Sequence, residues 1–280
     1  MSNQILEIYN KLDKEQLQFV DSKIIEGTFK MKRWLEFLQP IAQMDKLNDQ
    51  SRKKRSIGIG FIIFGMVVSF FVGFGFPPFF VVLAGLTVLL IIQLRNLNKL
   101  KKLDLGNHLR LFLMPFLVIL KEESSDDAKA KIKFDASSPI SDKKMVKTTN
   151  SENRGYPKIK TSFYNHPWLN AEFQLADGSF IILDFTDFIV KKNITKRGSS
   201  GKIKYKTKIK IKHNLGIKIS FRKDHYHLQT SNGGFHYADS PDYHQFKTKR
   251  KTITFSIDES IVFNDVLGLI SSSYQNVKAI

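Results

Sequence analysis

The longest uncharged stretch of the chain organises the rest of it. Residues 56–94 contain no Asp, Glu, Lys, Arg or His. A membrane-spanning helix needs about 20 apolar residues, so this stretch is long enough for two. Pro77 and Pro78 divide it, because proline cannot continue a helix but can begin one. The pattern predicts a two-helix transmembrane hairpin over residues 56–95, with a re-entrant loop or a buried hairpin in a soluble core as alternatives.

Small residues recur at four-residue spacing in the first predicted span, at Gly65, Ser69 and Gly73. Residues at this spacing lie on one helix face and allow another helix to approach closely. We expect this face to pack on the second span or to support homo-oligomerisation. Neither span contains an ionisable side chain, which argues against a pump or transporter.

Basic residues flank the hairpin on both sides, at residues 52–55 and 95–102, whereas the connection between the spans is uncharged. The positive-inside rule therefore predicts that both termini are cytoplasmic. We expect an integral protein of a bacterial-type inner membrane or plasma membrane.

Helical periodicity continues outside the spans. Residues 1–55 predict amphipathic N-terminal helices, whose apolar faces would pack on the rest of the protein, on another copy or on the membrane surface. Residues 96–123 predict an interfacial helix kinked at Pro115. Residues 124–155 are rich in Ser, Asp and Lys and predict a linker with one strand at most.

Two-residue alternation begins near Tyr156, and residues 156–280 predict a basic antiparallel β domain closed by a helix over residues 260–274. The Asp177-Gly178 pair predicts a two-residue hairpin turn that pairs Leu175 with Phe180. A second hairpin is predicted at residues 214–216, pairing Ile211 with Ile219.

A row of lysines is the main candidate for a binding site. Six lysines alternate with other residues before residue 213, so a strand would present all of them on one face, and two further cations follow. The residues predicted to bind an anionic partner are Lys202, Lys204, Lys206, Lys208, Lys210, Lys212, Lys218 and Arg222. A solvated sheet face, an anionic lipid or acidic protein, and nucleic acid are the three alternatives.

Composition supports an anionic partner. The chain has 44 Lys and Arg against 26 Asp and Glu, a formal net charge of +18, and no Cys. Such an excess of positive charge favours association with lipid headgroups, nucleic acid or acidic proteins. The lack of cysteine excludes disulfides and thiolate metal sites.

Histidine supplies the other candidate chemistry. The weak candidates for metal ligands are His225, His227, His236 and His244, but their spacing matches no metal signature, so we predict no metal site and no cofactor. We identify no catalytic motif and expect a protein that is not an enzyme.

Together these patterns predict an α+β membrane protein that acts as a membrane-anchored scaffold or binding protein. Its cytoplasmic β domain would engage an anionic partner, and the protein could assemble as a homo-oligomer. An oligomeric pore or membrane-perturbing effector gated by the soluble domain is one alternative. A metal-dependent hydrolase or a nucleic-acid-binding membrane protein is another.

Overall fold

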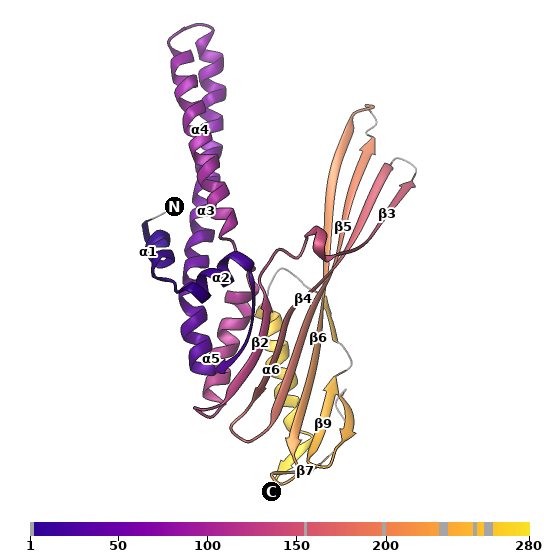
Figure 1. The fold of residues 1–280 in the computed structure, drawn as a ribbon. Helices are drawn as coiled ribbons and strands as arrows, with labels where there is room; N and C mark the ends of the chain where they lie inside the picture. The colour runs from indigo at the N-terminus through magenta and orange to yellow at the C-terminus, as the bar shows by residue number, and fades with distance from the viewer. Residues whose placement is uncertain (1–2, 154–155, 198–199, 230–234, 249–250, 255–259) are drawn as a thin grey trace. The chain divides into compact units, whose positions relative to one another are not determined.

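The computed structural model describes residues 3–153, 156–197, 200–229, 235–248, 251–254 and 260–280 (Figure 1). The chain divides into two compact units, one formed by residues 1–21 and 36–105 and the other by residues 22–35 and 106–280. It combines helices with an antiparallel sheet, as the sequence predicts, and it contains two long apolar helices.

The first unit is helical. It contains α1 (Asn3–Lys11), most of α2 (Lys14–Ser22), most of α3 (Met31–Gly73) and α4 (Phe79–Lys102). Asp13 and Gln16 form a reciprocal capping box at the start of α2, because each side chain accepts a hydrogen bond from the other residue's backbone N–H, at 2.7 and 2.9 Å. α3 continues through Pro40.

Helices α3 and α4 are long and apolar enough to cross a membrane. They form a hairpin whose small-residue face lies against α4: a Cβ added at Gly65 would lie 3.4 Å from Leu86, and one at Gly73 would lie 3.1 Å from the Phe80 ring. Ser69 is buried on the same face. Small side chains therefore allow the two helices to approach, as we expected for packing within the hairpin.

The second unit is built on a nine-stranded antiparallel sheet. Its main path runs β1-β2-β4-β5-β6-β9-β8, while β3 pairs with β4 and β10 pairs with β6. The strands are β1 (Ile24–Lys30), β2 (Lys129–Asp135), β3 (Met145–Asn153), β4 (Tyr156–Gln174), β5 (Phe180–Arg197), β6 (Ile203–Arg222), β8 (Phe235–Asp239), β9 (Tyr243–Thr248) and β10 (Lys251–Thr254). A separate pair is formed by β7 (Tyr226–Leu228) and β11 (Val277–Ala279).

Three short helical segments complete this unit: the π-helix η1 (Leu109–Leu113), α5 (Met114–Glu122) and α6 (Ser260–Tyr274), with the 3-10 turn η2 (Asp142–Lys144) before β3. Aromatic rings join η1 to the sheet, since Phe112 lies 4.8 Å from Phe185 and 5.6 Å from Trp168 between ring centroids. The helix predicted over residues 96–123 is thus interrupted: α4 ends at Lys102, and η1 and α5 follow.

The structure differs from the predicted domain boundaries in two places. Residues 1–55 are not all helical, because β1 pairs with β2 across the sequence, from Ile24 with Asp135 to Lys30 with Lys129. Residues 124–155, expected to be a linker, contain β2 and β3, both in the main sheet. The alternating buried positions Ala130, Ile132 and Phe134 stabilise β2, whereas β3 is polar and gave no sequence signal.

The predicted β4–β5 hairpin is present, but its register differs by one residue. Gln174, rather than Leu175, pairs with Phe180. Gly178 has a φ of +82°, and Asp177 is not among the residues with positive φ. A type I′ turn needs positive φ at both central residues, so a longer loop with one left-handed glycine forms instead.

The predicted hairpin at residues 214–216 is wrong. β6 is continuous from Ile203 to Arg222, and Ile211 pairs with Ile189 of β5 rather than with Ile219. The odd-numbered residues keep the same face on both sides of Gly216, and Leu215 is fully buried in the core. Because the alternation never changes phase, burial of Leu215 favours one long strand over a turn.

Candidate functional site

The distal parts of four strands form a basic ribbon, which we define as β3 with residues 156–163 of β4, 190–197 of β5 and 203–212 of β6. The burial of β5 alternates regularly up to Val190 and then stops, and residues 203–212 of β6 are all exposed. Figure 1 shows these strand ends projecting from the rest of the sheet. The β6 side of the ribbon therefore offers both of its faces to a partner.

The predicted lysine row lies along one face of this ribbon. Lys204 to Lys212 occupy alternate positions of β6, and the unbroken register with β5 keeps them on one side. The partners of Lys204 and Lys208 on β5 are themselves lysines, Lys196 and Lys192. Like charges at directly opposed positions repel, so an anionic ligand would stabilise this face.

The remaining predicted residues have different surroundings. Lys202 precedes β6, and Lys218 lies beyond the ribbon, on the half of β6 that covers the core. Arg222 donates from Nε to Asp224 at 2.9 Å and contacts it again through Nη2, so its charge is already compensated. The lysines from Lys204 to Lys212 are thus the part of the predicted set that lies on the ribbon, and all five are exposed.

The opposite face of the ribbon is also basic, but it carries apolar side chains as well. Register places Arg197 beside Ile203 and Lys191 beside Ile209, while Tyr205 is 82% exposed. Glu152 is the only acidic residue in sequence ranges 145–163 and 188–212. The positive field of the ribbon is therefore almost uncompensated within it.

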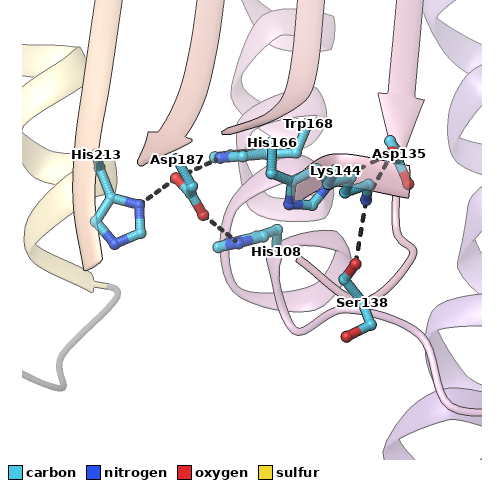
Figure 2. Close-up of polar contacts among 8 residues, drawn as sticks. All are labelled: His108, Asp135, Ser138, Lys144, His166, Trp168, Asp187 and His213. Carbon is cyan, nitrogen blue, oxygen red and sulfur yellow. Dashed lines mark hydrogen bonds and ion pairs between the residues drawn. The ribbon is translucent and has the colours of Figure 1, made fainter. Parts of the chain in front are cut away.

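A buried polar cluster lies where β4, β5 and β6 meet the base of the ribbon (Figure 2). A β-bulge in β4 between Pro167 and Leu169 leaves Trp168 without a partner residue on β5. His166 and Trp168, two positions apart, are both buried, and beyond the bulge burial shifts to Leu169 and Ala171. His108 reaches the same place from the residue before η1 and stacks on Trp168, with 4.2 Å between ring centroids.

Asp187 is the centre of this cluster and is 2% exposed. Its Oδ1 accepts a hydrogen bond from Trp168 Nε1 at 3.0 Å and lies 2.5 Å from His213 Nδ1, while its Oδ2 lies 3.4 Å from His108 Nε2. Burial raises the pKa of Asp187, but the hydrogen bonds from His108 and His213 outweigh it and hold the pKa well below its usual range. The buried carboxylate is therefore ionised and fully engaged.

A second carboxylate, the partly buried Asp135, has its own set of donors. Lys144 Nζ lies 2.9 Å from Oδ2, the Ser137 N–H donates to Oδ1 at 2.8 Å, and His166 Nε2 lies 3.5 Å from Oδ2. Burial raises the pKa of Asp135, whereas His166, Ser137 and Lys144 lower it below its usual range. Figure 2 shows that Lys144 also reaches the Ser138 carbonyl, so this group fixes the segment between β2 and β3.

Chemically, the cluster can fix the orientations of its rings. An imidazole–carboxylate–imidazole chain orients both rings through the shared carboxylate. Asp187 and His213 are also register partners on β5 and β6. The cluster therefore ties together the two strands that carry most of the lysines, immediately before they leave the core.

The histidines weighed as metal ligands have separate partners. His225 Nδ1 lies 3.0 Å from the Asp177 carbonyl, and His244 Nδ1 lies 3.0 Å from the Tyr237 hydroxyl. His227 is on β7 and His236 on β8, in different sheets. Among the described residues, these four do not contribute to any group of three side chains that could share one ion.

The described residues include one acidic group with metal-sized spacing, at Asp45, Asp49 and Asp104, whose oxygens lie within 4.8 Å of one another. Arg52 lies among them, with Nη1 3.4 Å from Asp49 and in contact with Asp104. Asp45 also accepts a hydrogen bond from the Leu105 N–H at 3.0 Å. These contacts let the group hold the end of α4 against α3 without an ion.

Sequence reasoning missed the buried cluster. Asp187 could have been found from the sequence, because it continues the alternating series of Ile181, Leu183 and Phe185, which are all buried. A carboxylate at a core position demands buried donors, and His213 occupies the equivalent position in the series on β6. His108 could not be found this way, since the fold alone brings it to the site.

Comparison with protein-family models, with curated proteins and with solved structures finds no match for this chain.

Proposed function

We propose that this protein is a membrane-anchored, cytoplasm-facing binding or scaffold protein, and that the basic ribbon recruits an anionic partner to the membrane. The observation that carries the proposal is the row of exposed lysines on residues 203–212 of β6, a segment that is exposed on both faces. Each cation near an anionic surface contributes on the order of 1 kcal/mol of attraction. A row of five alternate lysines is therefore enough for measurable binding.

The two apolar helices support the anchoring half of the proposal. Both are long and apolar enough to span a membrane, and only 11% and 0% of their apolar 18-residue segments are buried. A core helix of a soluble protein would instead bury most of such an apolar segment. The basic flanks favour a cytoplasmic location for both termini.

The buried cluster supports the proposed binding role of the ribbon, because it attaches the ribbon rigidly to the core. Exposed two-sided strands lack a core of their own and need a rigid attachment. Asp187 and His213 supply a buried cross-strand contact, and they are the last pair of β5 and β6 toward the ribbon in which both residues are buried. A partner would then meet a preorganised surface, which lowers the entropic cost of binding.

The test uses the full chain in nanodiscs of neutral phosphatidylcholine, so that the protein's own bilayer carries no net charge. Three probes are compared by fluorescence titration across a salt series: vesicles containing phosphatidylglycerol, an acidic polypeptide, and single-stranded RNA. Binding of vesicles or acidic polypeptide that weakens with salt supports the proposal. Exclusive binding of RNA with a steep salt slope would assign the ribbon to nucleic acid instead, and no binding of any probe would refute it.

A further inference from the structure

Among the strands that the structure describes, β6 has no neighbour on one of its edges along the basic ribbon. On one side, residues 203–211 pair with β5. On the other side, the described neighbours begin only at Lys212, which pairs with β10, and continue from Lys218, which pairs with β9. In the part of the chain that the structure describes, the outer edge of residues 203–211 therefore has no strand beside it.

The polar backbone groups at this edge can be assigned to particular residues. The Ile217 N–H donates to Thr248 Oγ1 at 3.0 Å, and the same hydroxyl donates to the Ile217 carbonyl at 3.3 Å. Thr248 belongs to β9, on the side of β6 away from β5. Backbone direction alternates along a strand, and the register with β5 is unbroken, so Tyr205 and Thr207 also direct their N–H and C=O groups to the open side.

The side chains beside this edge differ between its two faces. Lys204, Lys206 and Lys208 lie on one face, and Ile203, Tyr205 and Ile209 lie on the other. The latter three are 58%, 82% and 49% exposed. An added strand places each of its residues on the same face as the residue it opposes, so this edge fits a segment in which acidic and apolar residues alternate.

We propose that the open edge of β6 binds an extended acidic segment of a partner protein by strand addition. The inference rests on the proposed function and names the chemistry of the partner. Backbone hydrogen bonds to Tyr205 and Thr207 would hold the segment, and the lysine row would select its charge.

The lysine row also decides against a second copy of this chain as the occupant. Lysines commonly protect edge strands from pairing with one another, because two copies would place like charges side by side. The same charges attract a strand that carries carboxylates at alternate positions. The row thus rejects self-association and accepts an acidic partner, which is specificity by both repulsion and attraction.

The test uses the full chain in neutral nanodiscs and a fluorescein-labelled peptide of alternating Glu and Val. A peptide of the same composition with its glutamates in one block is the control for charge alone. Tyr205→Pro removes one outward N–H without removing a bond to β5, and Tyr205→Val removes the same side chain but keeps the N–H. We expect affinity for the alternating peptide to fall on the order of tenfold for Tyr205→Pro and to change little for Tyr205→Val.

Equal affinity of wild type and Tyr205→Pro, or equal binding of the alternating and block peptides, would overturn strand addition. A second measurement needs no substitution in the protein. The backbone amides of the peptide are methylated at either the odd or the even positions, and only one of these two peptides should lose binding. If both methylated peptides bind as the parent does, the inference fails. Vesicle binding without peptide binding would leave the proposed function standing and refute this inference, whereas no binding of any probe would refute both.

Discussion

Asp187 and His213 face each other across β5 and β6, with 2.5 Å between the carboxylate Oδ1 and the imidazole Nδ1, and they are the last pair toward the ribbon in which both residues are buried. The contact is between residues 26 positions apart, and it joins the hydrophobic core to the basic ribbon. Its energetics therefore bear on both stability and binding.

Removing the Asp187 carboxylate should strongly destabilise the second unit. Asp187→Ala leaves Trp168 Nε1 and two imidazoles without their acceptor in a buried site, and breaking such a buried charged network costs about 3–5 kcal/mol. Asp184→Ala is the matched control, because Asp184 is on the same strand but exposed. Chemical unfolding followed by circular dichroism should show a large loss for the first variant, and comparable midpoints for the two would contradict the assignment.

Acidification should also destabilise the protein through Asp187 and Asp135. The folded state lowers both pKa values below the unfolded value of about 3.9. A lowered pKa contributes stability that is present above about pH 4 and is lost as the pH falls toward the folded pKa. Thermal unfolding between pH 6 and pH 3 should show this loss in wild type and a flatter profile in Asp135→Asn, while parallel profiles would argue against the ionised carboxylates.

At alkaline pH the tyrosines around Asp177 should behave differently from the others. Tyr226 and Tyr274 each donate to Asp177 Oδ2 at 2.6 Å. Burial and the neighbouring carboxylate raise the pKa of Tyr226 to about 12 and raise that of Tyr274 further. The stability they contribute is complete below about pH 10 and is lost as the pH rises through the folded pKa values.

Absorbance at the phenolate band tests this directly. Of the 8 tyrosines in the chain, these two should keep their protons after exposed ones have ionised. Tyr226→Phe should remove part of the late transition. A single transition near pH 10 would show that Asp177 does not hold the two phenols.

Packing within the apolar hairpin can be tested at its glycines. Gly73→Ala would place a Cβ 3.1 Å from the Phe80 ring, whereas Gly85→Ala meets no atom within 4 Å. Alanine is otherwise about 1 kcal/mol better than glycine in a helix, so Gly85→Ala should be neutral or stabilising and Gly73→Ala destabilising. Thermal stability in detergent distinguishes the two variants. An equal rise in melting temperature for both would show that Gly73 does not pack closely on α4.

Stoichiometry in the same detergent addresses the remaining alternative for that face. Gly65 and Gly73 already contact α4 in the hairpin, so a single copy satisfies them. We expect light scattering to give the same mass for wild type and Gly65→Leu. A wild-type oligomer that dissociates in the variant would instead favour the pore or membrane-perturbing function considered from the sequence.

Much of the architecture was predictable because its causes are local. Lack of charge over residues 56–94 requires an apolar environment, and strict alternation from Lys202 to Lys212 fits only a strand. The Asp-Gly turn was found for the same reason, although only Gly178 adopts positive φ and the register moved by one residue.

What could not be predicted depends on contacts between distant residues. Asn214 and Gly216 are residue types common in turns, but burial of Leu215 in the core keeps β6 continuous. β3 has no apolar alternation and exists because it pairs with β4. The bulge beside Trp168 and the stacking of His108 on that indole follow from the packing of the core.

The most direct test of the central claim is charge reversal on the ribbon. The variant Lys204→Glu, Lys206→Glu, Lys208→Glu, Lys210→Glu is compared with a control of equal net charge, Lys14→Glu, Lys46→Glu, Lys121→Glu, Lys278→Glu, whose lysines are exposed and scattered. Affinity for the anionic probe that wild type binds best is measured in neutral nanodiscs at low salt. We predict that the ribbon variant loses binding and the control keeps most of it. Equal affinities for the two variants would show that overall charge, and not the basic ribbon, attracts the partner.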